Sequence, residues 1–374
     1  MLEHNFTGPS FTVGIEEELM LLDPETLELA QRITDVLEGV PDELDGQVKP
    51  ELLQSFLEVA TKPHPNVPSA GEELRVLRRS LTEVAEGLGL RVAGAGTHPS
   101  ALWEDQLVVD DPRYERIVEE LQYVVRQFLI FGTHVHVGVE GADRAIYVAD
   151  GLRRYLPLML ALSTNSPFLR GRPTGMMSSR IPVYRALPRA GIPPHFGSWE
   201  AYAERVEVMM RAGAIQDYTF LWWDVRPHPN LGTVEVRVFD QQTRVELTVA
   251  LAALTVSIAH RLSGFYDNGA ELVSYPTELV DDNKVRAAVK GMNGVLIDFW
   301  SAEEVPAERF AMRLLGVLSE HAQELGCERE LAGVGELLAG NTGAHRQLRI
   351  WDENPDLKSL VAGIVEASRV DSTI

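Results

Sequence analysis

The sequence predicts an α+β fold in one domain. In the first two-thirds of the 374 residues, short extended segments alternate with helical segments, whereas the last third shows almost only helical periodicity. No internal repeat, low-complexity tract or linker divides the chain. We therefore expect a single domain over residues 1–374, with a sheet-containing core at about 8–265 and a helical part at about 266–374.

Each expected element follows from hydrophobic spacing and from flanking residues. Leu74, Leu77 and Leu81 share one face of a helical stretch, and Asp111 stands where a helix N-cap is expected. The expected strands are 11–22, 48–61 (one extended stretch or two short strands), 91–96, 130–139, 218–225 and 233–239. The expected helices are 69–87, 111–127, 144–162, 245–265, 283–292, 302–324 and 356–369.

Two segments between these elements are rich in Pro and Gly. Residues 163–197 are too long for a simple connection, and long ordered loops in compact domains are usually functional. Residues 226–232 contain two prolines and a glycine, which predict a turn between the last two strands.

Composition and charge exclude several classes of partner. The chain is 45% hydrophobic and 24% charged, which is typical of a globular enzyme. Its net charge of −21 would repel nucleic acids and anionic membranes, and no apolar run reaches the roughly 20 residues of a membrane span. Cys327 is the single cysteine and the N-terminus shows no signal-peptide pattern, so we expect a cytoplasmic protein.

Three of the expected strands carry chemically active side chains in pairs at positions i and i+2, which lie on one face of a sheet. The pairs are Glu16 with Glu18, His134 with His136, and Glu235 with Arg237. Valines alternate with the second and third pairs, so the opposite face is expected to be apolar and packed. A solvated polar face is the simpler interpretation, but such faces are usually built from Lys, Thr, Ser, Gln and Glu, and paired histidines between valines are less ordinary.

Glu51 and Glu58 lie in another extended segment. A spacing of seven would place them on opposite faces of one regular strand, so both point inward only if a bulge or a break separates them. From this segment alone, either side chain could equally be exposed to solvent.

Several carboxylates that face one cleft repel one another unless divalent cations lie between them. Oxygen-rich sites with few histidines and no cysteine suit Mg²⁺ or Mn²⁺. Such sites commonly hold nucleotide phosphates. The sequence has no Gly-x-x-x-x-Gly-Lys-Ser/Thr loop, so phosphate binding must come from metal ions and arginines.

Taken together, these motifs resemble those of the bacterial carboxylate–amine ligases, also called type 2 glutamate–cysteine ligases. The similarity runs from about residue 8 to about residue 265 and no single motif carries it. The motifs are Gly-Ile-Glu-Glu-Glu at 14–18, Gly-Thr-His-Val-His-Val-Gly at 132–138, Asn-Ser-Pro-Phe-Leu-Arg-Gly at 165–171, Ser-Ser-Arg at 178–180, Trp-Trp-Asp-Val-Arg-Pro-His at 222–228 and Thr-Val-Glu-Val-Arg at 233–237.

The resemblance implies a glutamine synthetase-like catalytic fold, with a curved antiparallel sheet that forms a funnel and helices packed outside it. It implies that Arg237 contacts the ATP phosphates as a catalytic residue and that Arg180 binds the carboxylate of the amino-acid substrate. Trp222, Trp223 and Arg226 either line the nucleotide site or belong to the core, and His136 is expected beside the metal ligands rather than among them. The implied ligands of Mg²⁺ (or Mn²⁺) are Glu16, Glu18, Glu51, Glu58, His134 and Glu235.

The expected reaction is ATP-dependent ligation of the γ-carboxylate of glutamate, or of a related acid, to an amine such as cysteine through an acyl phosphate. We also expect small amino-acid substrates and a homo-oligomer, with a dimer favoured. Two alternatives remain open at the level of sequence. One is a metal-dependent amide hydrolase that uses the same carboxylates, and the other is a non-catalytic binding protein on an enzyme fold.

Overall fold

The centre of the molecule is a seven-stranded antiparallel sheet with the strand order β2-β3-β1-β5-β9-β8. The seventh strand, β4, pairs with the C-terminal end of β1. The computed structural model describes residues 2–44, 46–338 and 340–370. The strands of this sheet are β1 (Val13–Leu22), β2 (Val48–Pro50), β3 (Phe56–Ala60), β4 (Arg91–Ala93), β5 (Gly132–Gly138), β8 (Val225–His228) and β9 (Thr233–Asp240).

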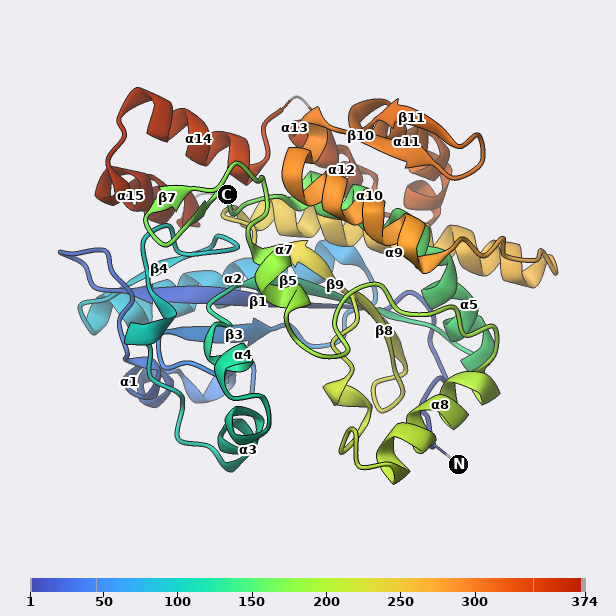
Figure 1. Cartoon of the computed structure of the whole chain (residues 1–374), viewed down its shortest axis with the longest axis horizontal. Coiled ribbons are helices and arrows are strands. Elements are labelled where there is room, and N and C mark those ends of the chain that lie inside the picture. Colours follow the sequence, from blue (N-terminus) through green and yellow to red (C-terminus); the bar gives the residue numbers. More distant parts are fainter. Residues whose placement is uncertain (1, 45, 339, 371–374) are drawn as a thin grey trace.

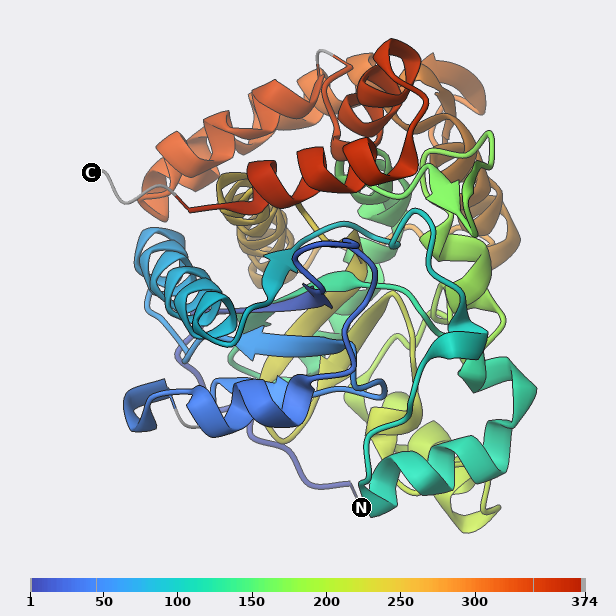
Figure 2. The same ribbon diagram turned by 90° about the vertical axis from the view of Figure 1, so that its left-hand side faces the viewer.

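One face of the sheet is apolar and fully packed. The valines of β5 and β9 are completely buried, and helices α2, α5 and α9 pack against this sheet. The helical C-terminal part lies on the same side of the sheet as α9, whereas α3 and α4 lie on the other side (Figures 1 and 2). The sheet-covering helices are α2 (Val67–Gly87), α5 (Ala142–Leu152) and α9 (Val245–Asp267).

The remaining elements surround this core. Two short hairpins lie outside the main sheet, β6 (Phe168–Leu169) with β7 (Arg172–Pro173) and β10 (Val295–Asp298) with β11 (Glu303–Pro306). The other helices are α1 (Ile33–Gly39), α3 (Pro112–Leu121), α4 (Tyr123–Arg126), α6 (Leu156–Ser163), α7 (Arg180–Arg185), α8 (Trp199–Arg211), α10 (Thr277–Lys290), α11 (Ala307–Glu324), α12 (Glu328–Ala332), α13 (Val334–Leu338), α14 (Gly343–Glu353) and α15 (Leu357–Ser368).

Helix α9 is long and apolar enough to cross a membrane when judged by length and composition alone. However, 83% of its most apolar 18-residue window is buried inside the protein. Its residues pack against α2, α5 and α11, which is the setting of a core helix.

The α+β organisation and most of the expected strands are confirmed. The stretch 48–61 forms two strands, β2 and β3, and the interruption between them allows both Glu51 and Glu58 to face the same side. The expected helix 69–87 corresponds to α2, which begins slightly earlier because Asn66 caps it by accepting a hydrogen bond from the Ser69 amide.

Two of the expected helices are interrupted, so their continuous form was wrong. The stretch 144–162 is divided into α5 and α6 by a 3-10 turn, because Pro157 lacks an amide hydrogen and its ring crowds the carbonyl four residues earlier. The stretch 111–127 is divided into α3 and α4 at Gln122, whose φ of 47° lies outside the helical region.

The expected strand 218–225 was also wrong. Residues Tyr218–Phe220 form a 3-10 turn, and β8 begins only at Val225 and continues through Pro227. The expected turn 226–232 therefore begins too early. A proline is tolerated here because β8 is an edge strand and needs fewer ladder donors.

The loop 163–197 and the C-terminal part hold more structure than the sequence indicated. The loop contains the β6–β7 hairpin and α7. The C-terminal part is not purely helical, because β10 and β11 precede α11 and replace its expected first turn. The helices α1, α8 and α14 were not predicted from the sequence.

Candidate active site

The polar face of the sheet carries one continuous row of charged side chains that is set by strand register. Glu18 on β1 is opposite Glu58 on β3, and Glu16 is opposite His134 on β5. Across the next two ladders, His136 is opposite Glu235 on β9, and Glu235 is opposite Arg226 on β8. Because residues at i and i+2 share a face, antiparallel pairing alone brings these side chains together.

Glu16 lies at the centre of this row. One of its carboxylate oxygens is 3.0 Å from His134 Nδ1 and the other is 3.3 Å from His136 Nε2. Burial opposes ionisation, but His136 and His134 hold the pKa of Glu16 well below its usual range. Ligand atoms of Glu16, Glu58 and His134 lie within 4.8 Å of one another, and so do those of Glu16, His136 and Glu235. The row can therefore hold cations at two neighbouring places.

His136 was expected beside the metal ligands, but the structure groups it with Glu16 and Glu235 as a candidate ligand. Its Nδ1 is 3.0 Å from Thr233 Oγ1, whereas its buried Nε2 has no hydrogen-bond partner among the described residues. That nitrogen points toward Glu16 and Glu235. The geometry therefore places His136 as close to a cation position as the expected ligands.

Three further carboxylates crowd the other end of the row. Burial, together with Glu16 and Glu51, raises the pKa of Glu58 well above its usual range. Burial and the neighbouring Glu18 raise the pKa of Glu51 to about 7, and burial also raises the pKa of Glu18. Lys49 is the nearest balancing cation, but its Nζ is 3.7 Å from Glu58 and its side chain is half exposed. These carboxylates lack sufficient counter-charge, which is the electrostatic condition that Mg²⁺ or Mn²⁺ relieves.

At the β9 end of the row, two arginines balance the negative charge of Glu235. Arg226 donates from Nε and Nη2 to one oxygen of Glu235, at 2.9 and 2.7 Å, and Arg237 pairs with the other. Although burial opposes it, the two arginines hold the pKa of Glu235 well below its usual range. Nη1 of Arg226 also donates to the carbonyls of Thr219 and Leu221. These contacts fix the guanidinium in place, and its other two nitrogens hold Glu235. Nucleotide binding by Arg226 stays a prediction.

Arg237 has donors left over. Its Nη1 contacts Glu235 and lies 3.5 Å from His134 Nδ1, while its buried Nε has no hydrogen-bond partner among the described residues. A guanidinium held in this way beside the carboxylate row is suitably placed to meet a phosphate.

Arg180 is the first residue of α7 and not a loop residue as expected. It is 2% exposed, and its Nη groups donate to the backbone carbonyls of Val238 and Arg237. Its guanidinium lies over the Tyr184 ring, 5.0 Å from the ring centroid. Its Nε has no partner among the described residues, so one donor is free for a ligand. Its expected role in binding a substrate carboxylate stays a prediction.

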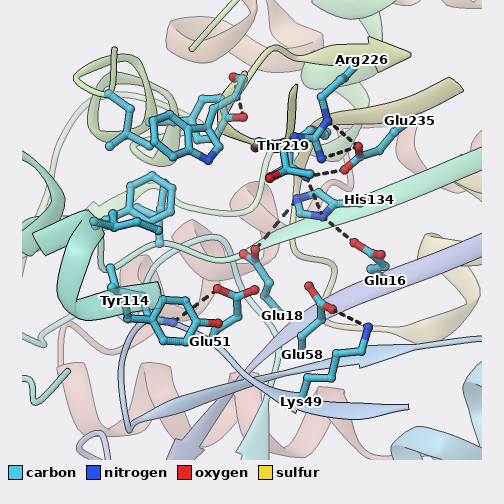
Figure 3. A pocket seen from close by; sticks show the side chains of 18 of the residues that line it. Glu16, Glu18, Lys49, Glu51, Glu58, Tyr114, His134, Thr219, Arg226 and Glu235 are labelled. Carbon is cyan, nitrogen blue, oxygen red and sulfur yellow. Dashed lines mark hydrogen bonds and ion pairs between the residues drawn. The ribbon is translucent and has the colours of Figure 1, made fainter. Parts of the chain in front are cut away.

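These side chains line one cavity of about 460 Å³, within the range of small-molecule sites. Figure 3 shows Glu16, Glu18, Glu51 and Glu58 converging below His134, with Glu235 and Arg226 beyond. The wall opposite the sheet is largely apolar. Trp222 lines the cavity, whereas Trp223 is buried against Phe196. The apolar wall consists of Leu52, Ile117, Val125, Phe128, Leu187 and Trp222.

Two features of this site were not predicted from the sequence. Lys49 is opposite Glu58 across the β2–β3 ladder, and only the register reveals this pairing. Tyr114 on α3 lines the cavity near Glu51, and its hydroxyl donates to the Pro50 carbonyl at 3.0 Å. Helix α3 could be expected from its Asp111 cap, but not its position over the sheet.

Behind the row, Glu17 points into the packed face as its alternation predicts. Both of its oxygens accept from Arg78 on α2, at 2.5 and 2.7 Å, and Thr248 on α9 also donates to it. Arg78 donates in addition to the carbonyls of Gln242 and Thr243, which follow β9. One buried ion pair therefore fixes β1 to α2, α9 and the end of β9.

Comparison with known proteins decides the family. The model of "Glutamate-cysteine ligase family 2" matches residues 12–363. The chain belongs to this family. It is 40% identical over 368 residues to a Rubrobacter xylanophilus protein named "Putative glutamate--cysteine ligase 2-1", covering 98% of this chain and 97% of that protein. A Sorangium cellulosum protein named "Putative glutamate--cysteine ligase 2" is 41% identical over 360 residues, covering 96% of each.

Solved structures show the same fold. The glutamate–cysteine ligase of Francisella tularensis in complex with AMP superposes with a TM-score of 0.73 at 15% identity, covering 99% of this chain and 91% of that one. A bifunctional glutathione synthetase from Pasteurella multocida gives 0.67 at 16% identity, covering 96% of this chain and 52% of that one. The expected α+β fold of glutamine synthetase type and the expected ligase family are thereby confirmed.

Proposed function

We propose that this ligase uses ATP to join the γ-carboxylate of glutamate, or of a related acid, to an amine such as cysteine. The observation that carries this proposal is the charge imbalance in the cavity. Glu18, Glu51 and Glu58 have raised pKa values and insufficient counter-charge, and Arg237, whose side chain is 14% exposed, adjoins the same space. Such a cavity suits a cation-bound polyphosphate better than a neutral ligand.

Divalent cations at this row would neutralise the phosphates and draw negative charge away from the transferring group. The donors that fit Mg²⁺ are Glu16, Glu18, Glu51, Glu58, His134 and Glu235, and Nε2 of His136, which lies 3.3 Å from Glu16, adds a seventh candidate. Carboxylate-rich sites also accept Mn²⁺.

The chain's own residues would act through positioning and charge. Arg237, held by Glu235, would bind the γ-phosphoryl group while an oxygen of the substrate carboxylate attacks the phosphorus and ADP leaves. Arg180 would hold the substrate's other carboxylate. The amine nitrogen then attacks the carbonyl carbon of the acyl phosphate, the C–O bond to phosphate breaks, and inorganic phosphate leaves together with one proton from the amine. The apolar wall around Trp222 would exclude water, which protects the acyl phosphate from hydrolysis.

Two observations support this assignment over the alternatives. The family relatives are named as glutamate–cysteine ligases, and a fold neighbour binds AMP. Neither observation favours an amide hydrolase. A binding protein without catalysis could use the same arginine and carboxylates, so turnover of ATP is the property that separates the two functions.

The test is a substrate screen. The purified protein is incubated with ATP, Mg²⁺ and paired amino acids, and ADP, phosphate and ligated product are measured by mass spectrometry. We expect glutamate-dependent ADP release, and hydroxylamine should trap the acyl phosphate as a hydroxamate. If ATP survives with every acid–amine pair, or if product forms without ATP, ligation by this route is wrong.

We further propose that the protein is a cytoplasmic homodimer. Size-exclusion chromatography with light scattering would test whether it is a dimer.

A further inference from the structure

A second cluster of metal-binding side chains lies outside the cavity, where α9 meets α11. It consists of His260 on α9 with His321 and Glu324 on α11. None of the three lines the candidate active site. The proposed ligase reaction uses none of them, so the cluster requires a separate explanation.

The distances within the cluster suit a shared ion. The Nδ1 atoms of His260 and His321 are 3.0 Å apart, whereas Glu324 Oε2 is 3.5 Å from the other ring nitrogen of His260, Nε2. Because one ion binds only one of these two nitrogens, the spacing that counts a single donor atom from each side chain decides whether an ion fits. One ligand atom from each of the three side chains lies within 4.8 Å of the other two. Donor atoms that share one tetrahedral zinc ion lie roughly 3 to 4 Å apart, given metal–ligand bonds of about 2.0–2.2 Å.

The positions of the side chains are set by well-packed helices. Ile258 and Leu262 on α9 and Leu318 and Ala322 on α11 are all buried beside the cluster. His321 and Glu324 are three residues apart and therefore share one face of α11. The His260 ring is also held by Phe11, with ring centroids 4.7 Å apart. The two imidazoles therefore lose little side-chain freedom when an ion binds, whereas the exposed Glu324 side chain is ordered by the ion.

The donor types select the class of ion. Neutral imidazole is a good ligand for Zn²⁺ and neighbouring transition metals, whereas Mg²⁺ and Ca²⁺ prefer oxygen. Two imidazoles and one carboxylate match a three-ligand zinc set with a fourth position open to water. The cluster thus differs in kind from the carboxylate row of the cavity.

We propose that His260, His321 and Glu324 bind one divalent transition-metal ion of the zinc class. The ion connects the central core helix α9 to α11 of the C-terminal part. It stabilises the packing of these two helices and takes no part in the ligase chemistry.

The test compares metal binding by the whole protein and its variants. Zn²⁺ is titrated by calorimetry in the presence of Mg²⁺, and Co²⁺ is titrated with visible absorption as the spectroscopic readout. We expect His260→Asn/His321→Asn to bind one equivalent of Zn²⁺ less than the wild type and to lose the Co²⁺ band of this cluster, which is distinguished from absorption by Co²⁺ in the cavity by its presence in a cavity variant. His134→Asn, in the cavity, should keep that band. Zn²⁺ should raise the unfolding temperature of the wild type more than that of the double variant.

A milder variant keeps the test decisive if the double variant does not fold. Glu324 has a mostly exposed side chain, and Glu324→Gln removes one ligand with little change in shape. We expect its Zn²⁺ affinity at this site to fall by roughly 10- to 100-fold, at least as much as the loss of an outer-sphere partner costs. Glu308→Gln, the same change at an exposed residue of α11, is the matched control and should bind as the wild type does. Equal Zn²⁺ stoichiometry and affinity in the wild type, the histidine variants and Glu324→Gln would overturn the proposal.

Discussion

Glu17 and Arg78 form a buried, two-pronged ion pair directly behind the strand that carries Glu16 and Glu18. Neither side chain of the pair is more than 3% exposed. Alternation along β1 thus sends two carboxylates to the cavity and the one between them to an anchor on α2. The cavity face of the sheet and its support share one strand.

Glu17→Gln should destabilise the protein strongly. The change leaves the Arg78 guanidinium buried without its counter-charge, which typically costs about 3–5 kcal/mol in the free energy of unfolding. Denaturant unfolding measures this loss. Glu25→Gln, at an exposed position, is the matched control and should change stability by less than about 0.5 kcal/mol. Equal stability of the two variants would show that the pair contributes nothing.

Arg237→Lys should lower kcat while leaving the fold intact. Lysine keeps the charge but loses the planar fork that contacts Glu235 and reaches a phosphate. Loss of one such preorganised donor typically costs about 10²–10³ in kcat. Steady-state kinetics of ADP release measure it, with the exposed Arg309→Lys as control. Wild-type turnover in Arg237→Lys would remove this residue from the proposed mechanism.

The stability of the metal-free protein should depend on pH through Glu51. Its folded-state pKa is raised to about 7, from a usual value of 4.5, first by burial and then by Glu18. A raised pKa means that the folded protein binds this proton more tightly than the unfolded chain does. The stability from protonated Glu51 is therefore complete below about pH 4.5 and is lost as the pH rises toward 7.

The comparison of wild type with Glu51→Gln isolates this effect. In EDTA, the variant should gain stability relative to the wild type as the pH rises through this interval, and the difference should level off above it. Saturating Mg²⁺ should reduce the difference, because the cation favours the ionised carboxylate. Stability curves that stay parallel with pH would contradict the assignment to Glu51.

Glu58→Gln should separate metal binding from stability. Burial, Glu16 and Glu51 raise the pKa of Glu58 well above its usual range, so removing its charge relieves repulsion in the metal-free protein. We expect the variant without metal to be as stable as the wild type or more stable, by up to about 2 kcal/mol. Mg²⁺ at 100 times its dissociation constant should stabilise the wild type by about 2.7 kcal/mol and the variant by clearly less. Thermal unfolding with and without Mg²⁺ tests both expectations, and an unchanged response to Mg²⁺ would exclude Glu58 as a ligand.

Lys284→Met should test whether the C-terminal part unfolds together with the sheet. Lys284 on α10 is 1% exposed and pairs with Asp224, whose carboxylate oxygens lie 2.9 and 2.7 Å from its Nζ. Removing the lysine leaves Asp224 buried and unpaired, which should cost about 3–5 kcal/mol. If residues 1–374 form one domain, circular dichroism and tryptophan fluorescence should report one coincident transition at lower denaturant. Two separate transitions would contradict the single-domain prediction.

Local pattern was sufficient to predict the polar face of the sheet. The period of two along β1, β5 and β9 assigns Glu16, His134 and Glu235 to one face before any pairing is known. The same period sends Glu17 and the valines to the packed face. The breaks in 111–127 and 144–162 were harder to predict, because one unusual φ or one proline outweighs good helical spacing on either side.

The sequence by itself determined that Glu16, His134 and Glu235 share one polar face of the sheet, and it determined the ligase family that its motifs resemble. Only the tertiary structure decided the cross-strand pairs, such as Glu18 with Glu58 and Glu235 with Arg226, because strand register depends on contacts distant in the chain. It also decided that Arg226 supports Glu235 and that His136 stands among the candidate ligands. The physical reason is that alternation is a local property of the backbone, whereas partners, burial and charge balance arise only when distant segments pack together.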